Sequence, residues 1–286
     1  MANNIDSCQQ QINSELADVE WAHIAPGKVV VATEQRAWLY QPQSPEEQFA
    51  QPMMGQGSLT TTGKMLDTAI AAAQYTVNPD RRPPALTAIR WVWRLAGSYH
   101  LTHPVPQLME EAANRFSANN SSDLEAWALE KAQEETGHDR LALKDIQSLG
   151  YDAKAVVETL KPPAAIALMD YFIRSVRDRN PIDCIGYVYT MERLSLGIGE
   201  EYIQKIETLL PPEINATRCL RVHSSVGADA GHADENVSFI AGLSASERSR
   251  IARACYETAL MCFSPPSGEY ISDKEIKQLI ASLKID

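Results

Sequence analysis

Three segments of the sequence place carboxylate and imidazole side chains where an apolar helix face would otherwise continue. Glu135 and His138 are three residues apart, as are Asp229 and His232, and Glu192 lies between the two pairs. Residues three apart on an α-helix share a face, so each pair can present an oxygen and a nitrogen to one point. A mixed oxygen and nitrogen donor set favours iron, with manganese as the second choice, whereas zinc takes fewer carboxylates.

The first pair lies in a segment whose pattern predicts one long helix. It begins with a capping-box motif at Ser122 to Glu125 and ends at Gly150. At about 100° per residue, Glu135 falls on the apolar line of this helix, and Glu134 points to the solvent side. The apolar line consists of Leu124, Ala128, Ala142 and Ile146. Burying a carboxylate on such an apolar helix face costs free energy unless a cation neutralises its charge.

The other two segments show the same interruption. Glu192 lies within the apolar face of a helix expected from Pro181 to just before Pro211, and Asp229 lies within that of a helix expected over 213–242. The apolar positions are Ile185, Val188, Leu196, Ile203, Ile206 and Leu210 in the first helix, and Val222, Val226, Ala233 and Ile240 in the second. A single acid that faces the core is commonly neutralised there by hydrogen bonds or an ion pair. Three helices that each carry such an acid instead favour a metal site inside a helical bundle.

Length and composition fit a helical globular protein. The 286 residues are 44% apolar and 22% charged, with 14 glycines and few β-branched runs, which favours helices over sandwiches and barrels. The net charge of −11, without a basic cluster, argues against nucleic acid and anionic membranes as partners. No apolar run reaches the roughly 18 residues of a membrane span.

The N-terminal residues lack both the basic start and the apolar run of a signal peptide. The cysteines are odd in number, widely spread and without a CxxC motif. They are Cys8, Cys184, Cys219, Cys255 and Cys262. We therefore expect a cytoplasmic protein whose thiols are reduced.

The chain divides by composition into two predicted parts. Residues 1–60 are rich in Gln, Pro, Ser and Asn and are expected to form a partly irregular extension with one strand near Lys28 to Thr33. Residues 61–286 are expected to form an all-α bundle of about seven to nine helices, with a second capping box at Ser244 to Glu247.

The three segments together resemble the metal motifs of the haem-oxygenase-like diiron oxidases and oxygenases. Glu134 to Ile146, followed by Leu149 and Gly150, is similar to the first motif of that family; Met191 to Leu194, with Gly197 and Gly199, is similar to the second; and Val222 to Gly227, with Asp229 and His232, is similar to the last. The motifs follow in the family's order, with 54 residues from His138 to Glu192 and 31 from Glu192 to His223. The resemblance covers roughly residues 85 to 265. Relatives of this family include the TenA and PqqC proteins and a chlamydial death-domain-associating protein.

The resemblance implies a seven-helix bundle with a labile two-iron site that activates O2. Its reactions would be N-oxygenation, desaturation or oxidative carbon–carbon cleavage of a small organic substrate that the fold does not specify. Electrons would come from an external reductant, because the chain has neither clustered cysteines nor a dinucleotide fingerprint. The resemblance is compatible with a homodimer. The implied ligands are Glu135, His138, Glu192, His223, Asp229 and His232.

His223 departs from the family pattern. Five residues separate it from Asp229, where the family has three. On an unbroken helix His223 would lie about 120° from Asp229 and about 180° from His232. His223 can therefore bind the same metal only if the helix is bulged or unwound near Gly227, with Ser224 or Ser225 satisfying the freed backbone groups.

Three other interpretations fit parts of the sequence. A metal-free enzyme of the TenA or PqqC type would be a thiaminase-like hydrolase or a cofactor-independent oxidase. The hydrolase would use a catalytic cysteine, for which Cys184 and Cys219 are candidates. A ferritin-like bundle would need a further acid on an earlier helix, at Glu110 or Glu111. The third is a non-enzymatic partner-binding protein. Metal analysis and O2 consumption distinguish these alternatives from a diiron enzyme.

Overall fold

The computed structural model describes residues 19–77, 83–226 and 232–285, which are mostly helical apart from a small N-terminal sheet. They form two compact units, each built from separate stretches of chain. The first unit comprises Met1–Val77, Ile182–Thr190 and Gly231–Phe263, and the second comprises Asn78–Pro181, Met191–Ala230 and Ser264–Asp286. The division into parts at residues 60 and 61 stays a prediction. Within the described ranges, no helix has the length and apolarity to span a membrane.

The sheet of the first unit has three antiparallel strands in the order β1-β2-β3. The strand predicted near Lys28 is present, and the sequence analysis missed its two neighbours. The turn between the first two strands places Gly27 at φ +67°, a backbone conformation that favours glycine. The strands are β1 (Glu20–Ala25), β2 (Lys28–Ala32) and β3 (Ala37–Tyr40).

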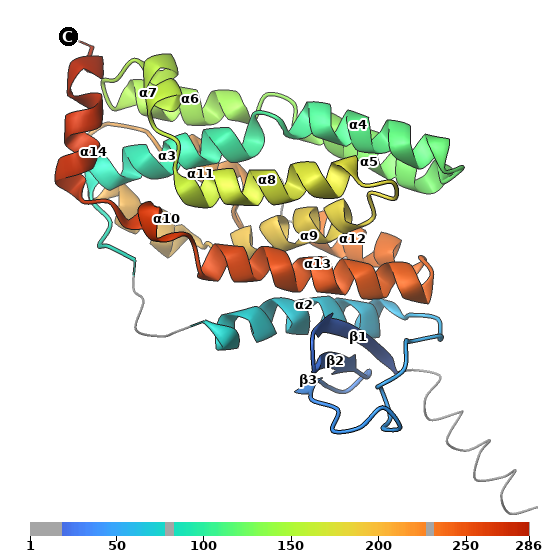
Figure 1. Cartoon of the computed structure of the whole chain (residues 1–286). Coiled ribbons are helices and arrows are strands. Elements are labelled where there is room, and N and C mark those ends of the chain that lie inside the picture. The colour runs from blue at the N-terminus through green and yellow to red at the C-terminus, as the bar shows by residue number, and fades with distance from the viewer. Residues whose placement is uncertain (1–18, 78–82, 227–231, 286) are drawn as a thin grey trace, which may run out of the picture. The chain divides into compact units, whose positions relative to one another are not determined.

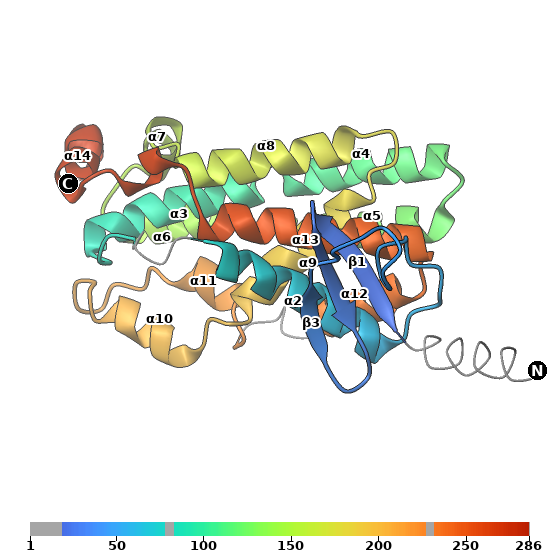
Figure 2. The same cartoon turned by 60° about the horizontal axis from the view of Figure 1, so that its bottom comes forward.

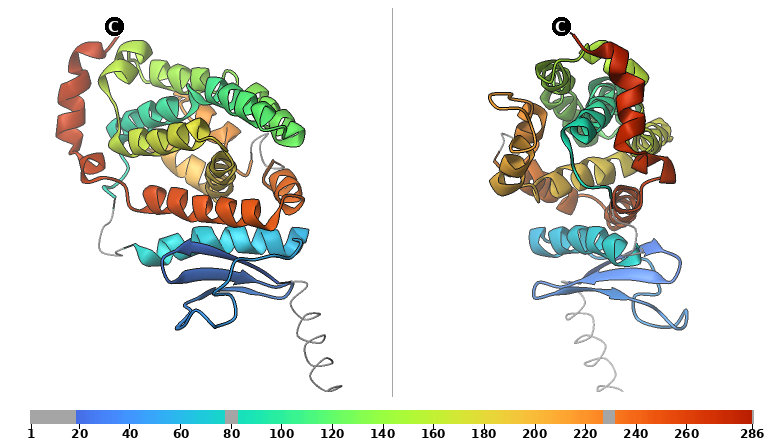
Figure 3. Two further views of the ribbon diagram at one scale, coloured as in Figure 1. Left: turned by 45° about the vertical axis from the view of Figure 1, so that its right-hand side comes forward. Right: turned by 90° about the vertical axis from the view of Figure 1, so that its left-hand side faces the viewer.

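Three helices of the first unit pack near this sheet. Helix α2 (Leu59–Thr76) lies along the sheet and contacts all three strands, as Figures 2 and 3 show. It also contacts α12 (His232–Ala241) and α13 (Ala245–Phe263). The capping box predicted at the start of α13 is confirmed, because the Ser244 N–H donates to the Glu247 carboxylate at 2.9 Å and the Glu247 N–H donates to the Ser244 hydroxyl oxygen at 3.4 Å.

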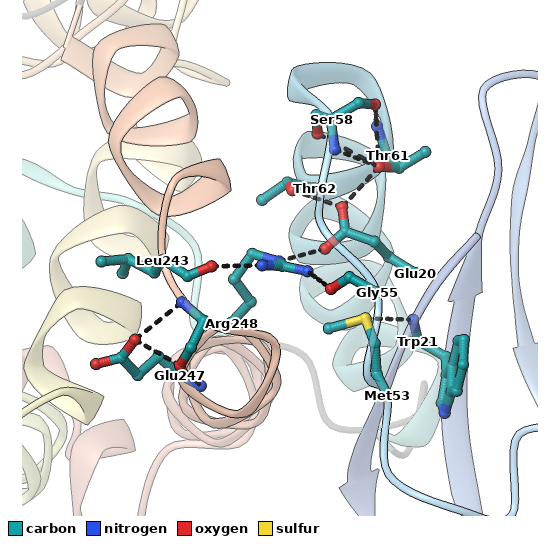
Figure 4. Close-up of polar contacts among 11 residues, drawn as sticks. Glu20, Trp21, Met53, Gly55, Ser58, Thr61, Thr62, Leu243, Glu247 and Arg248 are labelled. Atoms are coloured by element: carbon teal, nitrogen blue, oxygen red, sulfur yellow. Dashed lines mark hydrogen bonds and ion pairs between the residues drawn. The ribbon is translucent and has the colours of Figure 1, made fainter. Parts of the chain in front are cut away.

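A buried ion pair joins the sheet to the helices of the first unit (Figure 4). Arg248 Nε donates to Glu20 Oε1 at 2.6 Å, and both side chains are 1% exposed. Glu20 Oε2 accepts hydrogen bonds from the Thr61 and Thr62 hydroxyls at 2.6 and 2.5 Å. Arg248 also donates to the Gly55 carbonyl at 2.8 Å. The network thus satisfies both buried charges with strand, loop and helix groups.

Helix α9 (Asp183–Ser195) approaches α13 closely at Gly186. A Cβ added there would lie 2.5 Å from the Ile251 carbonyl oxygen and 2.6 Å from Ala254 Cβ. The Thr190 hydroxyl donates to the Gly186 carbonyl at 2.7 Å. The two backbones therefore leave no room for a side chain at this crossing.

Replacing Gly186 by alanine is expected to lower the free energy of unfolding by about 1–3 kcal/mol, because α9 and α13 must move apart. Gly63 in α2 is the control, since a Cβ there would make an ordinary 3.4 Å contact with Val237. Gly63→Ala should be neutral or stabilising by up to about 1 kcal/mol through helix propensity. Urea unfolding measures both, and equal effects would contradict the close crossing.

The second unit is mostly helical among its described residues, which also contain an isolated β-bridge between Tyr151 and Lys284. Helix α4 lies beside α5, α8 contacts α3 and α4, and α6 contacts α3 and α11 (Figure 1). An apolar core that includes Trp91, Leu95, Ile146, Leu160 and Ile206 is formed by α3, α6, α7, α10 and α14. The helices are α3 (Ala88–Thr102), α4 (Val105–Ala118), α5 (Ser122–Glu134), α6 (Asp139–Ser148), α7 (Ala153–Thr159), α8 (Pro163–Arg177), α10 (Glu200–Glu207), α11 (Arg218–Val222) and α14 (Asp273–Ile280).

The three long helices predicted around the inward acids are each interrupted, which corrects the sequence analysis. The predicted helix 122–150 breaks after Glu134, where Gly137 adopts φ +92°, and α5 starts from Ser121 without a side-chain cap. The helix predicted from Pro181 becomes α9 and α10, separated at 196–199. The helix predicted over 213–242 becomes α11 and α12, and α11 ends at Val222.

Candidate metal centre

Three of the predicted ligands lie together in the second unit. Glu135, His138 and His223 each offer one ligand atom, and these atoms lie within 4.8 Å of one another. His138 Nδ1 is 3.1 Å from Glu135 Oε2, and the rings of His138 and His223 meet edge-on with centroids 4.7 Å apart. All three residues are partly buried. The geometry therefore brings His223, which is distant in sequence, to the oxygen and nitrogen donors of Glu135 and His138.

The break between α5 and α6 positions the first two donors. Glu135 caps the C-terminal end of α5, and its N–H donates to the Lys131 carbonyl at 3.1 Å. His138 immediately precedes α6. Gly137 makes the turn between them at φ +92°, and a Cβ there would meet nothing within 4 Å, so the backbone conformation alone favours glycine. Glu135 and His138 consequently come together through a turn rather than along one helix face.

The third donor stands at the end of α11. The chain leaves the helix at His223, with φ −87° and ψ 12°, and forms turns through residue 226. The Ser224 hydroxyl donates to the Arg221 carbonyl at 2.9 Å, and Ser225 donates to the Ile198 carbonyl through its N–H and hydroxyl, at 3.2 and 2.9 Å. The helix therefore ends at Val222, within the stretch before Asp229 where unwinding was predicted. Ser224 donates to a carbonyl at the end of α11, as predicted, whereas the carbonyl that Ser225 binds belongs to Ile198, in another segment.

Two details of that prediction need correction or stay open. Val226, assigned to an apolar helix face, is 50% exposed, because the helix has already ended. Gly227 and Asp229 lie outside the described residues. His232 is the first residue of α12, but its side chain is also outside what the structure describes. Asp229 and His232 therefore stay predicted ligands.

A buried aspartate holds α11 against α6. Asp145, in α6, is fully buried and accepts hydrogen bonds from the Cys219 N–H at 2.9 Å and from Arg218 at 3.0 Å. Burial raises the pKa of Asp145, although both donors favour its charged form. Because α6 begins after His138 and α11 ends before His223, this anchor helps to bring the two imidazoles together. The sequence analysis placed Asp145 in a motif without recognising this role.

Glu192 is paired with a buried lysine. Its carboxylate, 15% exposed, lies 3.3 Å from the Lys131 ammonium, which is 6% exposed and also binds Glu134 at 2.8 Å. Burial alone would lower the pKa of Lys131, but Glu192 and Glu134 outweigh it and hold that pKa above its ordinary value. Lys131 therefore remains charged near neutral pH.

Lys131 does not stand out in the sequence, because lysines on helices are usually solvated. Its position four residues before Glu135 was the available signal, since that spacing places it on the same helix face. Glu134, predicted to point to solvent, is instead half-buried against Lys131, with its side chain 24% exposed. The acid-rich segment at the end of α5 thus contains its own cation.

The helical second unit thus groups oxygen and nitrogen donors of the kind that can hold a metal ion. Residues 92–264 match the model of a family described as iron-containing redox enzymes, and this chain belongs to that family. No curated protein matches the sequence significantly. The predicted family and the predicted all-α fold are therefore confirmed, and the chain is an iron-containing redox enzyme in general terms.

Two solved structures are similar to this chain. One is a domain of unknown function with a haem oxygenase-like fold from Shewanella denitrificans, at 19% identity and a TM-score of 0.54, covering 76% of this chain and 89% of that one. The other is a TenA homologue from Pseudomonas syringae pv. tomato, at 11% identity and a TM-score of 0.45, covering 74% and 98%. The similarity to the first structure shows that this chain has a haem-oxygenase-like fold.

Proposed function

We propose that this chain is a non-haem diiron enzyme that uses O2 to oxidise a small organic substrate. The observation that carries the proposal is the convergence of Glu135, His138 and His223, whose ligand atoms lie within 4.8 Å of one another. One carboxylate and two imidazoles form the mixed donor set that iron accepts, with manganese as the second choice. Membership of an iron-containing redox enzyme family supports the same metal.

The side chains around the donors have separable roles in this proposal. Glu135, His138 and His223 would hold the first ion, and Glu192 would contribute to the second. Iron supplies the one-electron chemistry and O2 activation that these side chains lack. Asp145 keeps α6 and α11 together and so orients the imidazoles. The sequence adds Asp229 and His232 as further ligands, and we expect an external reductant to deliver electrons.

The alternatives are less well supported by the described residues. Burial raises the pKa of the Cys219 thiol to about 12 and also raises that of Cys184, so neither offers the thiolate that a metal-free, cysteine-dependent enzyme needs. Glu111, a candidate ligand in a ferritin-like bundle, is paired with Arg115 at 2.8 Å and Arg177 at 3.5 Å. Glu110 is exposed. The diiron enzyme therefore remains the better account.

Anaerobic Fe(II) titration tests the proposal. The metal-free protein should take up close to two iron ions per chain, and the loaded protein should consume O2 when a reductant is supplied. Protein loaded with Zn(II), which has no redox chemistry, should consume none and is the control. A folded protein that takes up no iron would contradict the proposal. Iron uptake without O2 consumption would show that the protein binds metal but would contradict its role as an oxidising enzyme.

A further inference from the structure

Helix α11, whose end carries His223, has only five residues, Arg218–Val222. A helix this short makes few hydrogen bonds of its own and is marginal in isolation. The His223 N–H donates to the Cys219 carbonyl over 3.4 Å, which is long for such a bond. The direction in which the His223 side chain points therefore depends on contacts with other segments.

The last turn of α11 carries Arg221, which binds two acids of α10. Its guanidinium makes a bidentate pair with Glu200, at 2.9 and 3.1 Å, and donates to Glu207 Oε1 at 2.9 Å. The two acids are seven residues apart and share one face of α10. The Thr217 hydroxyl, just before α11, donates to the same Glu207 oxygen at 2.7 Å. Helix α10 is itself anchored, because Ile206 is fully buried in the apolar core. A bidentate pair within such a network holds its partners more firmly than an isolated surface ion pair.

These contacts fasten His223 to one segment from both sides. Arg221 lies two residues before it. Ser225, two residues after it, donates to the Ile198 carbonyl through its N–H at 3.2 Å and its hydroxyl at 2.9 Å, and Ile198 directly precedes the turn into α10. Asp145 fixes only the beginning of α11, through the N–H of its second residue. The end of α11, from which the imidazole projects, is therefore held mainly by α10.

We propose that Arg221 is a positioning residue for the metal centre, which clamps α11 to α10 and so directs the His223 imidazole at Glu135 and His138. This inference rests on the proposed metal-dependent function and adds to it a residue that binds no metal itself. The guanidinium is a cation, so its charge alone opposes the binding of a metal ion nearby. Removing Arg221 should therefore strengthen metal binding if only its charge matters, and weaken metal binding if the clamp matters.

The test is anaerobic Fe(II) titration of the full-length protein and of Arg221→Gln, with thermal unfolding of each variant. Because the clamp is lost, the Fe(II) affinity of Arg221→Gln should fall by roughly tenfold, the size of effect expected when a partner that orients a ligand is removed. Arg221→Lys keeps the charge but cannot make the two parallel bonds to Glu200, so it should also bind Fe(II) more weakly than the wild type. It takes the place of Arg221→Gln if glutamine impairs folding.

Arg94→Gln is the matched control. Arg94 donates to the hydroxyl of Tyr202, which is also in α10, at 2.7 Å. The variant therefore removes a cation contact from the same helix and leaves the bonds between α10 and α11 in place. Its Fe(II) affinity should differ from that of the wild type by less than about twofold, since ordinary surface contacts contribute little.

A second readout follows His223 directly and does not depend on activity. In the wild type the His138 and His223 rings meet edge-on with centroids 4.7 Å apart. Crystals of metal-free Arg221→Gln should show the His223 ring displaced from this contact, while Asp145 still accepts the Cys219 N–H. Protein loaded with Co(II), used as a coloured substitute for Fe(II), should have different visible absorption bands in the variant, because the imidazole has moved relative to the ion.

The outcomes distinguish the two proposals. A folded wild type that binds no Fe(II) overturns the proposed function itself. If the wild type binds Fe(II), equal or higher affinity in Arg221→Gln overturns only the role of Arg221. Wild-type affinity in Arg221→Lys also overturns it, because the bidentate clamp would then not be needed. An unchanged contact between His138 and His223 in the variant crystals would do the same.

Discussion

Arg248→Met is expected to lower the free energy of unfolding by about 3–5 kcal/mol, because it leaves a buried carboxylate without its cation. Glu20 and Arg248 are both 1% exposed and 2.6 Å apart, so water cannot replace the lost guanidinium without opening the packing of the first unit. The Thr61 and Thr62 hydroxyls would still donate to Glu20, but they carry no charge. Urea unfolding followed by circular dichroism measures the loss.

Arg253 provides a matched control on the same helix. It is half exposed and lies 3.7 Å from Glu257, a spacing and exposure at which an ion pair contributes little. Arg253→Met should change the free energy of unfolding by less than about 1 kcal/mol. Similar losses in the two variants would show that the buried pair is not the main link between the strands and α13.

Glu135→Ala is expected to weaken the first Fe(II) binding step by at least about 100-fold, because Glu135 would bind the ion directly. Losing a ligand should lower the metal affinity more than losing a side chain that only hydrogen-bonds to a ligand. Glu134→Ala removes the same charge from the neighbouring residue, but Glu134 binds Lys131 and does not belong to the donor group. It should change the first step by less than about tenfold.

Anaerobic Fe(II) titration with thermal unfolding of each variant separates metal loss from misfolding. Equal losses of iron in Glu134→Ala and Glu135→Ala, with both proteins folded, would mean that negative charge near the end of α5 matters and the specific ligand does not. A larger loss in Glu134→Ala would place the metal on the Lys131 side of the segment.

Helical periodicity placed Glu135 and Glu192 on apolar faces, and both side chains are partly buried, whereas Asp229 lies outside the described residues. It could not predict the breaks beside them. The helix from Ser122 ends at Glu134, before a turn in which Gly137 adopts a left-handed conformation. A hydrophobic pattern carries no information about such a turn, which depends on the local backbone. The helix that carries His223 ends at Val222, and the phase of His223 had required such a departure from a regular helix, but its role as a ligand stays a prediction.

Other features needed tertiary contacts that one sequence does not reveal. Strand β1 was missed because Glu20, at a buried position, interrupts the alternation of apolar residues, and its partner Arg248 is 228 residues away. Lys131 and Asp145 look like ordinary solvated charges in sequence. Their functions depend on Glu192 and Cys219, which come from other elements of the second unit.

Anomalous diffraction at the iron absorption edge, from crystals grown anaerobically with Fe(II), tests the central claim most directly. We expect a strong iron peak within bonding distance of Glu135, His138 and His223, and a second peak beside Glu192. A strong peak that none of Glu135, His138 and His223 contacts, or no peak in crystals where these side chains keep their mutual contacts, would contradict it.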